Sequence, residues 1–177
     1  MSMPEAPFSL AASDVAREMA SILNMAIPNR PLLVVNVGLP RSGKTTWSKL
    51  TKWTVVSPDA MRLAFQGRPF IQETEPWIWS MIRIMVKSLF IAGNEQVVLD
   101  GTFITANHRR AFHSCDLWDT IFNVFKVPEA ECHRRADVDG RPELHEVITR
   151  MSQDWEPVSP SEGLCYPSLD SQIHWFP

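Results

Sequence analysis

Short apolar runs alternate with longer segments of helical periodicity along most of the chain. The runs are rich in β-branched residues, which is the composition of strands buried on both faces of a parallel sheet. They lie at residues 32–37, 53–56, 96–100 and 121–127. Strands that alternate with helices predict an α/β fold, a parallel sheet of about four or five strands with helices on both faces.

The longest helical segment is expected at residues 75–92, where apolar side chains recur at helical spacing and should face the core. This stripe contains Trp77, Ile78, Met81, Ile84, Met85 and Leu89. Another helix is expected to open at Ser57, which can act as its cap, with Pro58 in the first turn. The remaining helices are expected after the loop at 38–45 and at 107–113, 129–135 and 143–155.

The chain has 177 residues, which suits one domain with a real core. Residues 1–30 form an N-terminal extension with one helix at 13–27, and residues 31–156 form the main domain. Residues 157–177 are rich in proline and show little periodicity. They predict a tail that packs on the domain, with a short edge strand near 172–176.

Residues 38–45 read G-x-x-x-x-G-K-T, the phosphate-binding loop pattern (P-loop, or Walker A). A strand that leads into a glycine loop and then a helix forms an anion site, because backbone N–H groups point inward and the helix dipole favours negative charge. Lys44 is expected to reach the β- and γ-phosphates of ATP, and the Thr45 hydroxyl to bind Mg²⁺. The residues expected to bind the nucleotide are Gly38, Arg41, Ser42, Gly43, Lys44, Thr45 and Thr46.

Two acidic residues follow predicted strands and are expected beside this loop, because ligands of parallel sheets bind at the carboxyl ends of the strands. Asp100 is a candidate to hold Mg²⁺ through water, or to cap the next turn. Asp59 can accept the proton of an attacking hydroxyl, or only complement a helix dipole. Arg62, one turn later, is a ligand for an acceptor phosphate or a solvated surface residue.

Arginines bracket a polar break at residues 137–142, after the fourth apolar run. Such a break beside a nucleotide site predicts a mobile lid, and one lid arginine can stabilise charge on the transferred phosphoryl group. The candidates are Arg134, Arg135 and Arg141. A solvated basic helix end is the alternative for each of them.

The overall charge gives no basic signature, since the net charge is -3 and the pI is about 5.9. A nucleic-acid partner would therefore have to meet a local patch, for which Arg62, Arg109 and Arg110 are candidates. Trp79 lies off the apolar stripe and is a better candidate than Trp77 to stack on a base.

The three cysteines lack metal-ligand spacing, and their odd number argues against a disulfide framework. No segment has the apolar length of a membrane span or the pattern of a secretion signal. We therefore expect reduced thiols, no membrane partner and a cytoplasmic location, which is the host cytoplasm if the chain is phage-encoded.

These motifs resemble the kinase domain of phage-type polynucleotide 5′-hydroxyl kinases and their small P-loop relatives, over about residues 32–156. The resemblance implies a kinase that uses ATP and Mg²⁺, with an alcohol group as acceptor. It implies Asp59 as general base, Arg62 on an acceptor phosphate, and an acceptor pocket near Thr102, where this chain looks longer than the family pattern. It also implies a lid arginine on the γ-phosphate, and Arg141 and Arg135 compete for that role. The matching segments are 38–47, 57–62, 98–102, 109–110, 124–128, 134–135, 141 and 147–151.

These motifs leave more than one phosphate acceptor possible. A nucleic-acid hydroxyl is favoured, DNA over RNA, either at a 5′ end or on a modified base such as 5-hydroxymethyluracil, and Asp59 would serve both. A kinase of a small metabolite, such as a sugar, antibiotic or nucleotide, is the alternative. A nucleotide-binding switch without catalysis is the weakest hypothesis, because it gives Asp59 and Arg62 no task.

Overall fold

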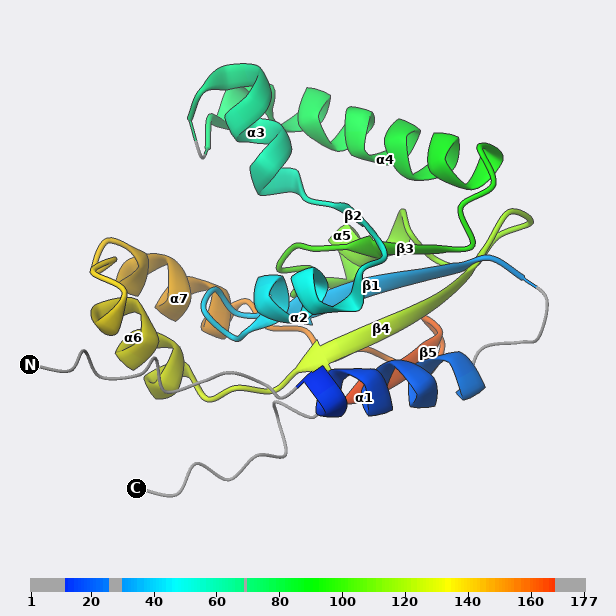
Figure 1. Ribbon diagram of the computed structural model, residues 1–177. Coiled ribbons are helices and arrows are strands. Elements are labelled where there is room, and N and C mark those ends of the chain that lie inside the picture. The colour runs from blue at the N-terminus through cyan, green and yellow to red at the C-terminus, as the bar shows by residue number, and fades with distance from the viewer. Residues whose placement is uncertain (1–11, 26–29, 69, 168–177) are drawn as a thin grey trace, which may run out of the picture.

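A computed structural model describes residues 12–25, 30–68 and 70–167, so the edge strand expected at 172–176 lies outside the described residues. All paired strands run parallel in one five-stranded sheet of order β2-β3-β1-β4-β5 (Figure 1). The expected α/β fold with helices on both faces is confirmed. The strands are β1 (Leu32–Gly38), β2 (Thr54–Val56), β3 (Gln96–Leu99), β4 (Asp119–Phe125) and β5 (Leu164–Pro167).

The central strand β1 sets the edge at which the site lies. Leu32 is paired with both Gln96 of β3 and Asp119 of β4, so the three strands begin level and end at the same side. Every residue of β1 is buried, which explains its continuous apolar run. β5 is an edge strand with an exposed Leu164, and the sequence carries no such run there.

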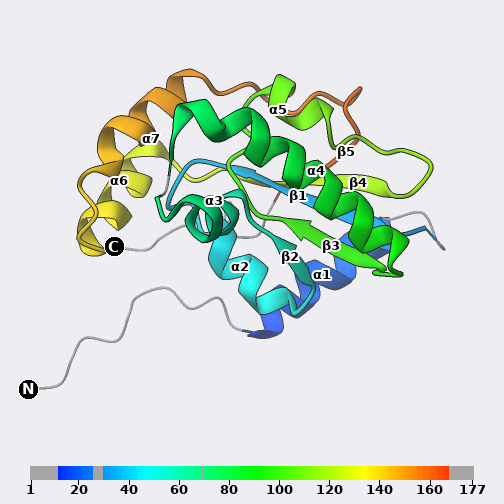
Figure 2. The ribbon, with the colours of Figure 1, turned by 90° about the horizontal axis from the view of Figure 1, so that it is seen from above.

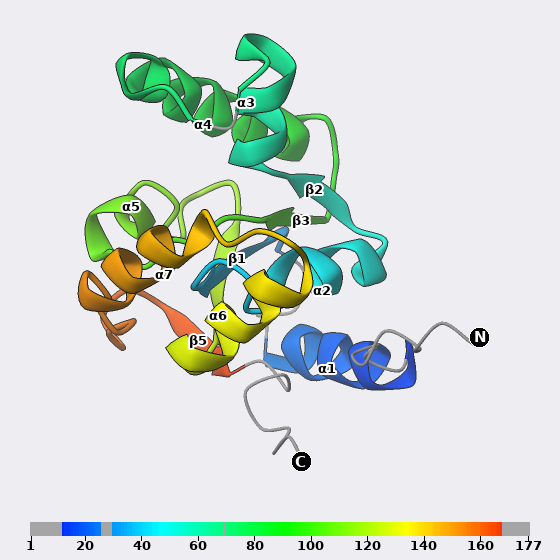
Figure 3. The same cartoon turned by 90° about the vertical axis from the view of Figure 1, so that its left-hand side faces the viewer.

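Helices cover both faces of the sheet. α1 and α2 pack on one face through a cluster that includes Val15, Ile22 and Trp47, and α4 packs on the other (Figure 2). Figure 3 shows the sheet between α4 and α1. The helices are α1 (Ala12–Met25), α2 (Lys44–Thr51), α3 (Pro58–Gln66), α4 (Glu75–Ile91), α5 (Ala106–Arg110), α6 (Glu129–Val138) and α7 (Leu144–Gln153), with a 3-10 turn at Gln72–Thr74.

The buried face of α4 differs from the predicted stripe. Its buried residues are Ile78, Ile82, Val86 and Phe90, whereas Trp77, Ile84 and Met85 are exposed. The prediction of Trp77, Ile84 and Met85 as core residues is therefore wrong. α4 is apolar nearly all round, so periodicity alone leaves the buried face undecided.

The N-terminal helix is tied to the helix of the phosphate loop. The Trp47 indole N–H of α2 donates a hydrogen bond of 3.0 Å to the buried Glu18 carboxylate of α1. A buried carboxylate needs such a partner, so this contact fixes α1 against α2. No helix among the described residues is long and apolar enough to cross a membrane.

Candidate active site

The phosphate loop connects β1 to α2. At Gly38 a Cβ atom would lie 2.7 Å from Ser42 Oγ and 3.0 Å from Phe125 Cβ, so a larger residue would force the loop open. Gly43 has a φ of 99°, in the left-handed region that favours glycine. These two positions let the N-terminus of α2 present its backbone N–H groups to an anion.

Lys44, the first residue of α2, curls into this loop. Its Nζ donates to the Leu39 carbonyl at 2.5 Å and to Ser42 Oγ at 3.2 Å. Burial lowers the pKa of Lys44 to about 8, while the carboxylates of Asp100 and Asp59 act to raise it. A phosphate in the loop would also favour the charged ammonium form, so anion binding and protonation of Lys44 support each other.

The residues near the loop fit a magnesium ion. Asp100 is 5% exposed at the end of β3, and its charge acts on Lys44. The Thr45 side chain at the start of α2 is exposed. Hydroxyl and carboxylate oxygens are the ligands that Mg²⁺ prefers, so Thr45 and Asp100 are the residues that would hold it. Both were expected from the sequence.

A buried amide network supports Asp100, and sequence reasoning missed it. Asn36 Nδ2 of β1 donates to Ser48 Oγ at 2.9 Å and lies 3.5 Å from Asp100 Oδ1. Asn36 Oδ1 accepts from Asn123 Nδ2 of β4 at 3.0 Å. The signal was an asparagine inside each of two otherwise apolar runs, because buried amides need partners.

Asp59 lies at the start of α3, beyond β2. Ser57 caps this helix by accepting a hydrogen bond from Ala60 N at 3.3 Å, as its position before Pro58 predicts. The Asp59 side chain is 84% exposed, and Arg62 Nη1 donates to its Oδ1 at 2.6 Å. Asp59 is thus a solvent-facing carboxylate held by one oxygen, suited to accept a proton.

Glu75 completes this group and was not anticipated. Its carboxylate accepts from Arg62 Nε and Nη2, each at 2.7 Å. Asp59, Arg62 and Glu75 are called the acceptor cluster below. It joins the first turn of α4 to α3, a contact that no pattern in the sequence indicates.

Trp79 is not the exposed stacking residue that we expected. Its ring lies parallel to His108 at a centroid distance of 5.6 Å and edge-on to Phe103 at 5.6 Å, and its N–H donates to Glu75 at 3.1 Å. Trp77 is the exposed one, at 46%, with its ring edge-on to Phe65. Trp77, and not Trp79, is therefore the exposed ring, because α4 turns a different face to the core than we expected.

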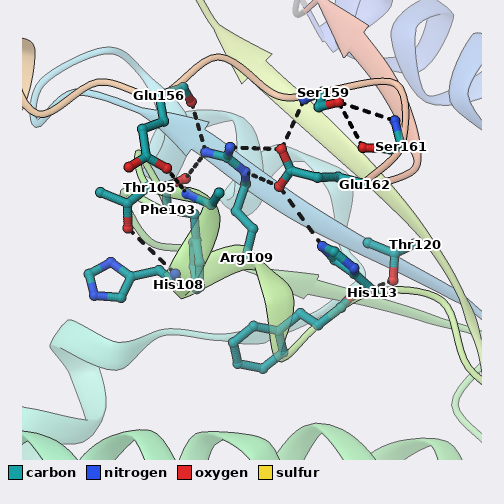
Figure 4. Close-up of polar contacts among 12 residues, drawn as sticks. Phe103, Thr105, His108, Arg109, His113, Thr120, Glu156, Ser159, Ser161 and Glu162 are labelled. Atoms are coloured by element: carbon teal, nitrogen blue, oxygen red, sulfur yellow. Dashed lines mark hydrogen bonds and ion pairs between the residues drawn. The ribbon is translucent and has the colours of Figure 1, made fainter.

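Arg109 does not belong to a substrate-binding patch. It is completely buried, pairs with Glu162 at 2.7 and 2.9 Å, and donates to the carbonyls of Phe103, Glu156 and Pro157 (Figure 4). This Arg109 clamp ties the segment before β5 to the β3–α5 loop. The assignment to substrate is wrong, because a guanidinium fully engaged inside the protein has no face for a ligand.

The β3–α5 loop is also fixed to the phosphate loop. Thr102 is half-buried, and its carbonyl accepts from Gly38 N at 2.9 Å. Thr102 therefore lies beside the start of the phosphate loop, at the edge expected from the sequence. Arg110 is exposed at the end of α5, away from the buried clamp of its neighbour.

The lid helices α6 and α7 bring arginines to the phosphate loop. Arg135 Nη1 donates to the Arg41 carbonyl at 3.2 Å, while its Nε pairs with Glu131 at 2.7 Å. Arg41 itself pairs with Asp139 at the end of α6. Burial, then the charges of Arg141 and Arg135, lower the pKa of Arg41, so three guanidinium groups share this region.

The other two lid arginines are held by neighbouring carboxylates. Arg134 is paired with Glu131 on the exposed side of α6, and Arg141 is paired with Glu143 between the lid helices. Arg41 of the phosphate loop thus contacts both Arg135 and Asp139 of the lid, and these contacts link the lid to the loop.

A pocket of about 560 Å³ lies between the phosphate loop, the end of β4 and the end of α7. It reaches from Leu39 of the loop to the end of α7, and its volume and mixed polar and apolar lining suit a nucleoside. Sequence reasoning missed it, because its walls come from distant segments. Its lining includes Leu39, Phe125, Val127, Pro128, Trp155 and Val158.

Comparison with known proteins identifies a matching family and several solved structures of similar fold. The family model described as AAA domain (AAA_33) matches residues 33–150. A search of curated protein sequences found no match.

Among solved structures, a chain of the Pnkp1/Rnl/Hen1 complex is 25% identical with a TM-score of 0.56, covering 63% of this chain and 40% of that chain. A chain of the Pnkp1/Rnl/Hen1 RNA repair complex is 21% identical with a TM-score of 0.55, covering 75% of this chain and 49% of that chain. This chain thus spans less than half the length of those two. A gluconokinase from Sinorhizobium meliloti 1021 is 17% identical with a TM-score of 0.54, covering 79% of this chain and 85% of that chain.

Proposed function

This chain belongs to the AAA domain family, and from its site we propose that it is a kinase that transfers the γ-phosphate of ATP to a hydroxyl group of a nucleic acid. The observation that carries the proposal is the approach of three separate segments to the phosphate loop. They are Asp59 after β2, Asp100 after β3, and the arginines of the lid. A protein that only bound a nucleotide would not need an exposed carboxylate beside the phosphates.

Each residue has a distinct task in this proposal. Backbone N–H groups at the start of α2 and the Lys44 ammonium bind the β- and γ-phosphates. Asp59 takes the proton of the acceptor hydroxyl as its oxygen attacks the γ-phosphorus, and the bond to the β–γ bridging oxygen breaks. Mg²⁺, held through Thr45 and Asp100, supplies charge neutralisation on the phosphates when it is bound.

The lid supplies positive charge over the migrating phosphoryl group. Arg135 is the stronger candidate for this task, because it already reaches the backbone of the loop at Arg41. Arg141, beyond the end of α6, is the second candidate and is paired with Glu143. The pocket lined by Leu39 and Trp155 takes the nucleoside of ATP.

A nucleic-acid acceptor is supported by the surface beyond the acceptor cluster. Phe65, Phe70 and Trp77 are exposed there, at 56%, 62% and 46%. The Phe70 ring lies 6.0 Å from the Arg62 guanidinium carbon. Exposed aromatic rings suit nucleobases, which stack on such rings without regard to sequence. The related fold in an RNA repair complex agrees with such an acceptor.

A small-metabolite acceptor is the second candidate, and the coverage of two metabolite kinases favours it. The gluconokinase and a shikimate kinase from Bacteroides thetaiotaomicron are covered over 85% and 86% of their own lengths, which is far more than the two Pnkp1 complex chains. One short P-loop domain is thus enough for kinases of small alcohols.

The deciding experiment is phosphate transfer from γ-labelled ATP to a panel of acceptors. The panel contains 5′-hydroxyl DNA and RNA oligonucleotides, end-blocked duplex DNA with 5-hydroxymethyluracil, gluconate and shikimate. We expect label on a nucleic acid, DNA before RNA. Label at internal positions of the blocked duplex would assign a base kinase over an end kinase. Label on the small alcohols alone would refute the nucleic-acid acceptor.

A further inference from the structure

The acceptor cluster constrains what Arg62 can do. Arg62 is only 11% exposed, and three of its five N–H groups are engaged. Two of these form a bidentate pair with Glu75, the fork geometry that a phosphate would otherwise use. The third holds Asp59 Oδ1 at 2.6 Å.

The charge of the cluster also opposes an anion. Two carboxylates flank one guanidinium, so negative charge is in excess. A phosphate that approached Arg62 would meet Asp59 on one side and Glu75 on the other, and like charges at this range repel. Burial acts to lower the pKa of Arg62, but the hydrogen bonds and charges of Glu75 and Asp59 together raise it above its ordinary value, so the guanidinium stays charged between its two carboxylates.

Aromatic rings close the remaining sides of Arg62. Its guanidinium carbon lies 5.8 Å from the Trp79 ring and 6.0 Å from the Phe70 ring. Trp79 in turn donates to Glu75 at 3.1 Å, so the carboxylate that holds Arg62 is itself held. The guanidinium is locked in one orientation by groups from α3, α4 and the segment between them.

From this arrangement we propose that Glu75 locks Arg62 as a positioning residue for Asp59, and that Arg62 is not a subsite for an acceptor phosphate. The inference rests on the proposed kinase function and concerns how the acceptor of that reaction is recognised. The acceptor hydroxyl is recognised without an adjacent phosphate, and Arg62 acts by fixing one oxygen of Asp59 so that the other faces the substrate. Among the described residues, that second oxygen has no partner.

The first test compares thymidine with thymidine 3′-monophosphate on protein saturated with ADP and Mg²⁺, by equilibrium binding and as acceptors with ATP. We expect the wild type to prefer neither form by more than about twofold, with the same ratio in Arg62→Gln. A preference of tenfold or more for the phosphate form that is lost in Arg62→Gln would overturn the proposal. The binding arm decides this even if neither compound is phosphorylated, which would count only against the proposed function.

The second test separates positioning from binding, using whichever acceptor on the panel is turned over. Glu75→Gln keeps the shape but removes the charge, and we expect kcat to fall tenfold or more while the acceptor KM stays within threefold. Glu73→Gln, the same change at an exposed site two residues earlier, is the matched control and should leave both unchanged. Arg62→Lys keeps the positive charge but cannot form the bidentate pair with Glu75. Its kcat should therefore also stay below that of the wild type. An unchanged kcat in Glu75→Gln, with ATP affinity and helix content as in the wild type, would refute the lock.

Discussion

Replacing Arg109 by alanine tests whether this residue is a structural clamp. The change removes a guanidinium that is 0% exposed and leaves the Glu162 carboxylate, itself 10% exposed, without its bidentate partner. It also removes the donor to the carbonyls of Phe103, Glu156 and Pro157. Breaking a buried ion pair by removing one partner costs about 3–5 kcal/mol.

That loss is large enough to measure by thermal or urea unfolding. For a chain of this size, each kcal/mol lowers Tm by about 2–4 °C, so we expect Arg109→Ala to lower Tm by about 6–20 °C. Arg110→Ala is the matched control, because the Arg110 side chain is exposed at the end of α5. This change should alter the stability by less than about 0.5 kcal/mol.

A double-mutant cycle with Glu162→Ala identifies the source of the loss. Because the two side chains are bonded to each other, we expect the double variant to lose less stability than the two single variants together. If Arg109→Ala lost less than about 1 kcal/mol and instead raised the acceptor KM, the clamp would be refuted and a substrate role restored.

Further predictions concern the chemistry and its pH dependence. Asp59→Asn should lower transfer about 10²–10⁴-fold in the γ-labelled ATP assay while ATP still binds, and retained turnover would remove Asp59 as the base. Lys44→Ala should weaken both ATP binding and transfer, and an unchanged ATP affinity by calorimetry would contradict the loop assignment. Arg135→Ala should lower kcat more than Arg141→Ala, and the reverse order in steady-state kinetics would assign the phosphoryl-stabilising role to Arg141. The hydrogen bond from its arginine partner lowers the pKa of Glu162, so the pair should stabilise the fold above the unfolded-state pKa, about 4.3, and lose this effect as pH falls below it. Urea unfolding at a series of pH values should show this acid-dependent loss in the wild type.

The sequence predicted the sheet well, because its central strands are buried on both faces and so leave a continuous apolar signal. β5 had no such signal, since an edge strand with an exposed Leu164 reads like loop. The buried face of α4 was also out of reach. Ile78 and Ile82 face the core while Trp77 and Ile84 do not, although all four are large hydrophobic residues.

The phosphate loop was determined by the sequence alone, because its function depends on local backbone geometry, a strand, two glycines and a helix N-terminus adjacent in the chain. Asp59 and Asp100 followed from the same rule, since parallel strands end at one edge. The partners of Arg62 and Arg109 did not follow, because the role of a guanidinium is decided by the carboxylates that reach it. Arg109 is engaged by Glu162, 53 residues away, and Arg62 by Glu75, 13 residues away. Only the tertiary structure brings these partners together, and it alone separates a buried clamp from a residue of the site.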